Sequence, residues 1–368
     1  MINFLYEDFL TDRPKLSNSE TIQEIKKSKN PLFLFGAGRY AECIYQILLS
    51  NKIEIQGVFV DNPTHDLFHG FQVKTFEEVL RDNVEIDVCI GHGNYSEMRN
   101  RHQRHERVTR VFDFFDWYGL NWTLNKDYFT QNARALTDVI NLFHDTYSKK
   151  AFLMHLRARV NNDWRLIQPL ITGPQYFEKF ISLSNNETFV DAGAYTGTTF
   201  LAFNRLVKGK FRKYYAFEPD ALNRKKLITL ISNGSIKNVT VLDKGCGAKS
   251  GRFKFLSNDD HSSIVNEYAQ EENHREAHSI DFIEVMKIDD LHDEISFIKM
   301  DVEGHEMEAL RGSSQTISIY KPKLAISAYH RPNDLFDIPL LIKALNPDYK
   351  LFFRHHKLTG ADAVFYAI

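Results

Sequence analysis

The stretch Thr188-Phe-Val-Asp-Ala-Gly-Ala-Tyr-Thr-Gly-Thr-Thr199 decides the fold of the larger part of this chain. Its apolar residues Phe189 and Val190 lead into Asp191, and a turn that holds Gly193 and Gly197 follows. After the turn, apolar residues recur at helical spacing, at Phe200, Leu201, Phe203, Leu206 and Val207. This order predicts a strand, a tight turn and a helix, with backbone N–H groups of the turn open to a ligand.

The residue that ends this strand indicates what kind of ligand the turn would bind. Asp191 stands at the carboxyl end, where open α/β sheets bind their ligands. A carboxylate suits an ammonium group, such as the amino end of S-adenosylmethionine (SAM), and the turn lacks the Gly-Lys-Ser/Thr ending of a P-loop. The alternative is a tight turn without a ligand. We expect the SAM contacts to be Asp191, Gly193, Ala194, Tyr195, Gly197 and Thr198.

A second acid follows about 20 residues after the turn, in Lys213-Tyr-Tyr-Ala-Phe-Glu-Pro-Asp220. At this offset, Glu218 would accept both ribose hydroxyls of the donor, with Pro219 beside it. The alternative is that Glu218 caps the next helix. A third strand and glycine turn at 238–247 would border the adenine.

The stretch Ile295-Ser-Phe-Ile-Lys-Met-Asp-Val-Glu-Gly-His-Glu-Met-Glu-Ala-Leu-Arg-Gly312 carries the predicted chemistry. An apolar strand delivers Asp301 and Glu303 to the same sheet edge, where Asp301 is also expected to contact SAM. The next strand, from Lys323, ends at His330. Methyl transfer to a hydroxyl needs a general base. His305 and His330 are our candidates because the pKa of histidine lies near neutrality, with Asp301 or Glu303 orienting or assisting.

Two alternatives stand beside this interpretation. Either histidine can be structural. Asp301, Glu303, His305 and His330 can also form a divalent-metal site, since oxygen-rich ligands with histidine suit Mg or Mn. Because the sequence shows no zinc spacing and gives no coordination geometry, we expect no metal.

Taken in order, these motifs identify a family. Phe-Val-Asp-Ala-Gly-Ala-Tyr-Thr-Gly, Ala-Phe-Glu-Pro-Asp, Ile-Lys-Met-Asp-Val-Glu-Gly-His-Glu-Met-Glu-Ala-Leu-Arg-Gly and the strand ending in His330 make residues 150–368 resemble the FkbM family of SAM-dependent methyltransferases. The resemblance implies a class I methyltransferase fold, a Rossmann-like, mostly parallel seven-stranded sheet with an antiparallel last strand. It also implies O-methylation of a hydroxyl, often on a sugar or a polyketide.

A second glycine turn lies in Pro31-Leu-Phe-Leu-Phe-Gly-Ala-Gly-Arg-Tyr-Ala41. It matches G-x-G-x-x-A, and Asp61 ends the next strand at about the offset of a ribose-binding acid. With further strands expected at 86–90 and 107–112, this unit resembles the small nucleotide-binding Rossmann domains attached to bacterial sugar-modifying enzymes. The resemblance implies either a scaffold without ligand or a nucleotide or sugar-nucleotide site at Gly36, Gly38, Arg39 and Asp61.

We therefore expect three parts: a smaller Rossmann-like domain at 1–116, a helical connector at 117–173, and a methyltransferase domain at 174–368. The connector is also a candidate homo-oligomer face. The basic segment 99–107 is expected to be a solvated helix face, or alternatively a contact for an anionic donor or glycan.

Composition narrows the class of protein. Among 368 residues the net charge is -2, which gives no support for nucleic-acid binding. Three cysteines far apart favour a reducing compartment over a disulfide framework. No signal peptide or membrane-spanning run is evident, so we expect a cytoplasmic protein.

The function that we expect is SAM-dependent O-methylation of a sugar, a glycan or a nucleotide-linked sugar. One alternative is an NAD-dependent oxidoreductase of a sugar nucleotide that uses the N-terminal fingerprint, although no Tyr-x-x-x-Lys motif accompanies it there. Another is a non-catalytic binding module with a methyltransferase fold.

Overall fold

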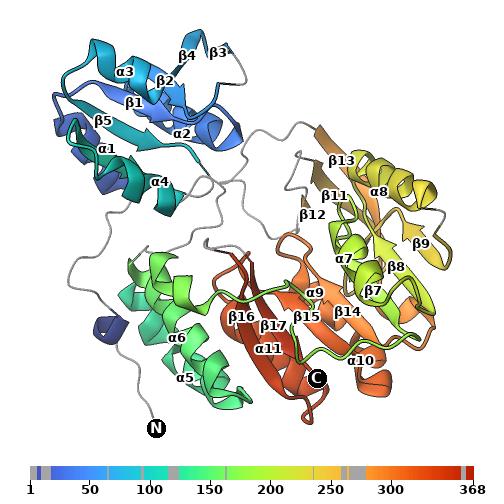
Figure 1. Cartoon of the computed structure of the whole chain (residues 1–368). Helices are drawn as coiled ribbons and strands as arrows, with labels where there is room; N and C mark the ends of the chain where they lie inside the picture. Colours follow the sequence, from blue (N-terminus) through green and yellow to red (C-terminus); the bar gives the residue numbers. More distant parts are fainter. Residues whose placement is uncertain are drawn as a thin grey trace. The chain divides into compact units, whose positions relative to one another are not determined.

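The computed structural model describes residues 6–9, 18–63, 66–92, 95–114, 124–161, 164–234, 236–257, 263–264, 279–357 and 362–368. Contacts within the chain divide it into two compact units (Figure 1). The N-terminal unit takes the described residues of 6–125 and 155–168, and the C-terminal unit takes those of 126–154 and 169–368. The predicted boundaries at 116 and 173 stay a prediction.

The N-terminal unit is built on a six-stranded sheet in the order β3-β4-β2-β1-β5-β6. All neighbours pair in parallel except β3 with β4. The strands are β1 (Leu32–Phe35), β2 (Gly57–Val60), β3 (Leu67–Phe68), β4 (Phe71–Thr75), β5 (Ile86–Ile90) and β6 (Val108–Asp113). The helical segments that lie wholly within it are η1 (Tyr6–Phe9), α1 (Asn18–Lys27), α2 (Arg39–Ser50), α3 (Phe76–Asp82) and α4 (Tyr95–His102).

The glycine turn after β1 packs tightly against the end of β5 and the start of α2. Gly36 has φ +115°, and a Cβ there would lie 2.3 Å from the carbonyl oxygen of Gly91, at the end of β5. A Cβ on Gly91 would in turn lie 2.6 Å from the Cα of Ala41 in α2. The glycines therefore let the turn, the strand end and the helix approach one another closely.

The C-terminal unit contains a seven-stranded sheet in the order β16-β17-β15-β14-β7-β8-β9. Its strands are β7 (Thr188–Ala192), β8 (Lys213–Phe217), β9 (Val239–Leu242), β14 (Phe297–Met300), β15 (Lys323–Ser327), β16 (Leu351–His355) and β17 (Ala363–Ala367). β17 runs antiparallel to both of its neighbours, and every other pair is parallel. The predicted mostly parallel sheet with an antiparallel last strand is confirmed.

Helices connect these strands, and the unit also contains a small second sheet. The helices are α5 (Lys126–Leu142), α7 (Thr198–Leu206), α8 (Ala221–Asn233), α9 (Glu306–Arg311), α10 (Ser314–Tyr320) and α11 (Asp334–Leu345), with η4 at Ile288–Leu291. The helix α6 (Thr146–Asn161) and η2 (Trp164–Leu170) extend across the division between the units. The small sheet has the order β10-β13-β11-β12, with β10 (Lys244–Cys246), β11 (Gly251–Ser257), β12 (Ser263–Ile264) and β13 (Ser279–Met286).

Aromatic rings form much of the core around β7. Phe189 stacks on Phe297 of β14 with ring centroids 4.6 Å apart, and Tyr214 of β8 meets it edge-on at 5.0 Å. All three are wholly buried, so this core holds β7 rigidly between its neighbours. Among the described residues, no helix is long and apolar enough to cross a membrane.

Candidate active site

The register of the large sheet brings the predicted residues to one edge. Ala192, the last residue of β7, pairs with Met300 of β14 on one side and with Phe217 of β8 on the other. Asp301 and Glu218 directly follow those two partners. The two carboxylates therefore flank the glycine turn after β7, as the motif order predicted.

The glycine turn is shaped by contacts that exclude side chains. Gly193 has φ +82°, and a Cβ there would lie 1.9 Å from the carbonyl oxygen of Asp301. Its N–H and that of Ala194 donate to the carbonyl oxygen of Phe217, at 3.1 and 2.9 Å. Gly197 has φ +93° and is the N-cap of α7, whose first residue is Thr198. The turn is thus fixed against both neighbouring strands.

Glu218 faces this turn with both carboxylate oxygens engaged by backbone N–H groups. Tyr195 donates to Oε2 at 2.7 Å and Asp220 donates to Oε1 at 2.9 Å. Burial raises the pKa of Glu218 to about 7, and the two N–H donors oppose that rise. The N-cap of α8 is Asp220, whose side chain accepts from Leu222 and Asn223, so the alternative cap role of Glu218 is wrong.

Asp191 is wholly buried, and partners within the protein occupy its carboxylate. The hydroxyl of Tyr214 donates to Oδ2 at 2.5 Å, and the ammonium of Lys299 lies 3.0 Å from Oδ1. The same ammonium donates to the carbonyl oxygens of Gly193 at 2.6 Å and Ala192 at 3.3 Å. Burial alone would lower the pKa of Lys299, but the carboxylates of Asp191 and Asp301 outweigh it and keep the ammonium charged.

Asp301 is oriented by two phenols and remains partly open. Tyr176 donates to its Oδ2 and Tyr329 to its Oδ1, both at 2.8 Å. Its side chain is 22% exposed, in contrast to the sealed carboxylate of Asp191. Asp301 is therefore a preoriented acceptor at the sheet edge.

His330 lies among carboxylates. Its Nδ1 is 2.9 Å from Oε1 of Glu306, and its Nε2 is 3.5 Å from Glu303 and 3.8 Å from Asp301. Burial by itself would lower the pKa of His330, but Glu306 and Glu303 outweigh it and raise the pKa well above its usual value. The imidazole is therefore protonated at neutral pH. Glu306 is itself buried and also accepts the N–H of Val302 at 2.8 Å.

His305 has the opposite protonation behaviour. It is 5% exposed, and burial followed by the positive charge of Arg331 lowers its pKa. Its Nδ1 has no hydrogen-bond partner in the part of the chain that the structure describes. A Cβ on Gly247, in the predicted adenine-side turn, would lie 3.9 Å from its Nε2. His305 is thus neutral near pH 7 and able to accept a proton.

Residues 191–351 match the sequence profile described as the methyltransferase FkbM domain. This region is an FkbM methyltransferase domain. Its methyl donor is SAM, and the resemblance seen in the sequence is confirmed. No curated protein matched the chain.

One solved structure has the same fold over nearly the whole chain. The crystal structure of the methyltransferase FkbM from Methylobacillus flagellatus KT superposes with a TM-score of 0.74 at 22% identity, covering 99% of this chain and 97% of that one. An rRNA methylase from Streptococcus thermophilus gives a TM-score of 0.31 at 15% identity, covering 50% of this chain and 87% of that one. Aeropyrum pernix fibrillarin, solved with bound SAM, gives 0.31 at 9% identity, covering 51% and 70%. The last two likenesses are too slight to carry an argument.

One group of side chains in the methyltransferase domain has metal-ligand character. Asp301, Glu306 and His330 each offer an atom within 4.8 Å of the others, in the part of the chain that the structure describes. Protein groups already pair with all three, because two phenols bond Asp301 and Glu306 bonds His330. The expectation of no metal stays a prediction.

The predicted nucleotide site of the N-terminal unit is only partly assembled. Gly36 and Gly38 precede α2, and Arg39 is its first residue, with a side chain outside the described part. Asp61, after β2, receives two hydrogen bonds of 2.8 Å from Arg101 of α4. The predicted ribose acid is therefore held by an arginine of the basic segment 99–107.

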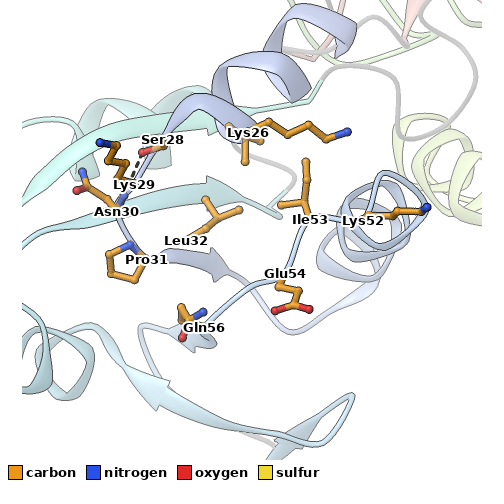
Figure 2. A pocket seen from close by; sticks show the side chains of 11 residues that line it. Lys26, Ser28, Lys29, Asn30, Pro31, Leu32, Lys52, Ile53, Glu54 and Gln56 are labelled. Carbon is orange, nitrogen blue, oxygen red and sulfur yellow. Dashed lines mark hydrogen bonds between the residues drawn. The ribbon is translucent and has the colours of Figure 1, made fainter.

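The N-terminal unit also has a cavity of about 480 Å³, shown in Figure 2. Its lining includes Lys26, Lys29, Lys52 and Glu54, around the residues that precede β1 and β2. These are the amino ends of the strands, whereas Gly36 follows the carboxyl end of β1. The cavity is therefore separate from the predicted nucleotide site.

Sequence reasoning missed the side chains that hold the site together. They are Tyr176, Tyr214, Lys299, Glu306 and Tyr329. A signal was present for Lys299, since a lysine within the apolar run Ile-Ser-Phe-Ile-Lys-Met must find a buried partner. The tyrosines gave no comparable signal.

Proposed function

We propose that this protein is an O-methyltransferase that acts on a hydroxyl of a sugar, a glycan or a nucleotide-linked sugar. The observation that carries the proposal is the gathering of Glu218, Asp301 and His330 at one edge of the sheet, inside the FkbM methyltransferase domain. A hydroxyl acceptor has to lose its proton, and His305 is a neutral base suited to take it. An acceptor that is already deprotonated, such as a carboxylate, would need no such base.

The donor site fits SAM on features of this chain. The backbone around Gly193 leaves no room for a side chain at that position. The neighbouring Glu218 accepts hydrogen bonds from the ribose hydroxyls of the donor. Tyr195, Gly197, Thr198 and Pro219 complete the turn around it. When bound, SAM supplies a methyl group on a sulfonium for in-line displacement by the acceptor oxygen.

The protein's own groups then have separate tasks. The hydroxyl proton goes to His305. His330 stays protonated through its pair with Glu306 and holds Glu303 and Asp301 in place by charge. Positioning of donor and acceptor contributes further, by an amount on the order of several kcal/mol in such reactions.

The N-terminal unit supports the proposal that the acceptor is a nucleotide-linked sugar. Its Rossmann-like sheet and the open turn at Gly38 suit the nucleotide part of a linked sugar, with Arg101 able to meet a phosphate if it leaves Asp61. An NAD-dependent oxidoreductase is less favoured, since no Tyr-x-x-x-Lys motif accompanies the N-terminal fingerprint. We further propose that the enzyme is cytoplasmic, because its few, widely spaced cysteines suit a reducing compartment. We also propose that it can form a homo-oligomer.

The test is methyl transfer by the full chain from methyl-labelled SAM. The acceptors would be free sugars, glycans and nucleotide-linked sugars, with amines and carboxylic acids as a matched panel. Mass spectrometry should find one added methyl group on a sugar hydroxyl. Transfer to an amine or carboxylate alone would contradict the proposal, and donor binding without transfer to any acceptor would favour the non-catalytic alternative.

A further inference from the structure

We infer that Asp301, and not Asp191, binds the ammonium group of the donor's amino-acid end, because Lys299 already serves Asp191 as an internal counter-ion. The inference rests on the proposed function only in taking SAM as the donor. It changes the role that the motif pattern gave to Asp191, from a ligand contact to a positioning residue.

The carboxylate of Asp191 has neither access nor spare charge for a ligand. It is wholly buried, and both of its oxygens face protein groups, the phenol of Tyr214 and the ammonium of Lys299. A donor ammonium would have to displace Lys299. That would leave a buried cation without its partner, which is strongly unfavourable.

Lys299 links Asp191 to the shape of the donor turn. Its ammonium bonds the carbonyl oxygens of Ala192 and Gly193 as well as the carboxylate. The carbonyl of Gly193 is therefore occupied too, at 2.6 Å. Through this lysine, Asp191 holds the backbone of the turn while it remains out of the ligand's reach.

Asp301 has what Asp191 lacks. Its backbone packs against the same glycine, since a Cβ on Gly193 would lie 1.9 Å from the carbonyl oxygen of Asp301. Tyr176 and Tyr329 each donate one hydrogen bond, so each oxygen keeps a lone pair for a ligand. Its side chain is 22% exposed.

Local charge also favours a cation here. Three carboxylates, Asp301, Glu303 and Glu306, surround the single imidazolium of His330 within 2.9–3.8 Å. When Asp191 and the cations Lys299 and Arg331 are counted as well, four carboxylates face three cations, so one negative charge remains in excess. A primary ammonium placed at Asp301 would offset it.

The span between the two proposed donor contacts is consistent with an extended ligand. Glu218 follows β8 and Asp301 follows β14, and β7 lies between these strands. Neighbouring strands are about 4.8 Å apart, so the two carboxylates stand roughly 10 Å apart across the turn. A ribose at one end and an ammonium at the other fit that separation.

The experiment is calorimetry of the full chain with two ligands that differ only in the part in question. S-adenosylhomocysteine carries the amino-acid end, and 5′-methylthioadenosine lacks it. Asp301→Asn should weaken S-adenosylhomocysteine binding by about tenfold or more and change methylthioadenosine binding less than twofold. Asp191→Asn should change the two affinities by the same factor, because it acts through the turn.

A double variant controls for unfolding caused by a single unpaired buried charge. Asp191→Asn with Lys299→Met removes both buried charges together, and it should again leave the ratio of the two affinities unchanged. If the ratio falls tenfold on changing Asp191 and stays constant on changing Asp301, the inference is overturned while the methyltransferase assignment stands. If the unmodified chain binds neither ligand, the donor site itself is refuted and the inference falls with it.

Discussion

The two glycine turns of this protein follow the same sequence plan and end in different chemistry. Each comes after a buried parallel strand and precedes a helix, and each is followed by an acid at the end of the next strand. In the N-terminal unit that acid, Asp61, is 50% exposed and bonded to Arg101. In the methyltransferase domain the acid, Glu218, is buried and bonded to backbone N–H groups of the turn itself.

The difference lies in what the neighbouring strands contribute. After β7, the turn is bonded by Lys299 of β14 and packs against Asp301, which directly follows that strand. After β1, the neighbouring strand end contributes Gly91, a close packing contact without a functional side chain. A glycine turn becomes a built site when buried polar groups of adjacent strands converge on it.

Two buried histidines give the largest expected contrast. His305→Ala should lower kcat by about 10²–10⁴-fold with SAM affinity retained, since it removes the proposed base. His102 of the N-terminal unit is also buried, with its pKa lowered to about 4 by burial, but it packs among Phe35, Phe59 and Phe76. His102→Gln should keep the rate per folded molecule. Initial rates of methyl transfer to an acceptor with a free hydroxyl check both, and an unchanged rate in His305→Ala would show that His305 is not the base.

The two ion pairs give the next contrast, in stability. Lys299→Met leaves the buried Asp191 with the Tyr214 hydroxyl but without a counter-ion, and it should cost about 3–5 kcal/mol of unfolding free energy. Arg101→Met breaks a pair that is about half exposed on both sides and should cost about 0–1 kcal/mol. Denaturant unfolding measures both. Similar losses of unfolding free energy in the two variants would show that burial does not make the Lys299–Asp191 pair more important than the Arg101–Asp61 pair.

The glycines themselves come third. Gly193→Ala places a methyl group against the backbone of Asp301 at φ +82°, and we expect a loss of about 2–3 kcal/mol together with weakened SAM binding. Gly38→Ala is the matched control, because φ is −99° there and no atom lies within 4 Å of the added Cβ. Thermal melting should show a clear shift in the first variant and almost none in the second. Unchanged donor affinity in Gly193→Ala would contradict the proposal that the turn at Gly193 binds the donor.

The last contrast, and the smallest over a single pH unit near neutrality, is a pH dependence of opposite sign in the two units. The raised pKa of His330 stabilises the methyltransferase domain fully below about pH 6.5, its unfolded value, and this contribution is lost as pH rises through the folded pKa. The lowered pKa of His102 acts the other way, so the N-terminal unit loses stability as pH falls from about 6.5 toward 4. Each pKa unit corresponds to about 1.4 kcal/mol.

Hydrogen exchange resolved by unit measures this pH dependence. Glu306→Gln should remove the alkaline loss in the methyltransferase domain and leave the acid loss in the N-terminal unit unchanged. A common pH profile for both units would count against the assignment of these two histidines.

Sequence reasoning reached the fold because the periodic apolar runs and glycine turns are local signals. It placed β7, β8, β14 and β15 and the residues at their carboxyl ends correctly, as the parallel register confirms. It did not find the short pair β3 and β4, which lacks a run long enough to stand out.

The state of each site residue was harder to predict, because it depends on partners distant in sequence. The burial of Asp191 against Lys299 and Tyr214 joins three strands. The contrast between His305 and His330 arises from Glu306 and Arg331, which the motif alone does not arrange in space. Residue types at a sheet edge were predictable, whereas their charges were not.

The most direct test of the central claim is a crystal structure of the full chain with S-adenosylhomocysteine. The account predicts the ligand at the carboxyl ends of β7, β8 and β14, with ribose hydroxyls at Glu218 and the amino group at Asp301. Ligand density at the Gly36–Gly38 turn of the N-terminal unit, with nothing bound beside Glu218, would contradict it.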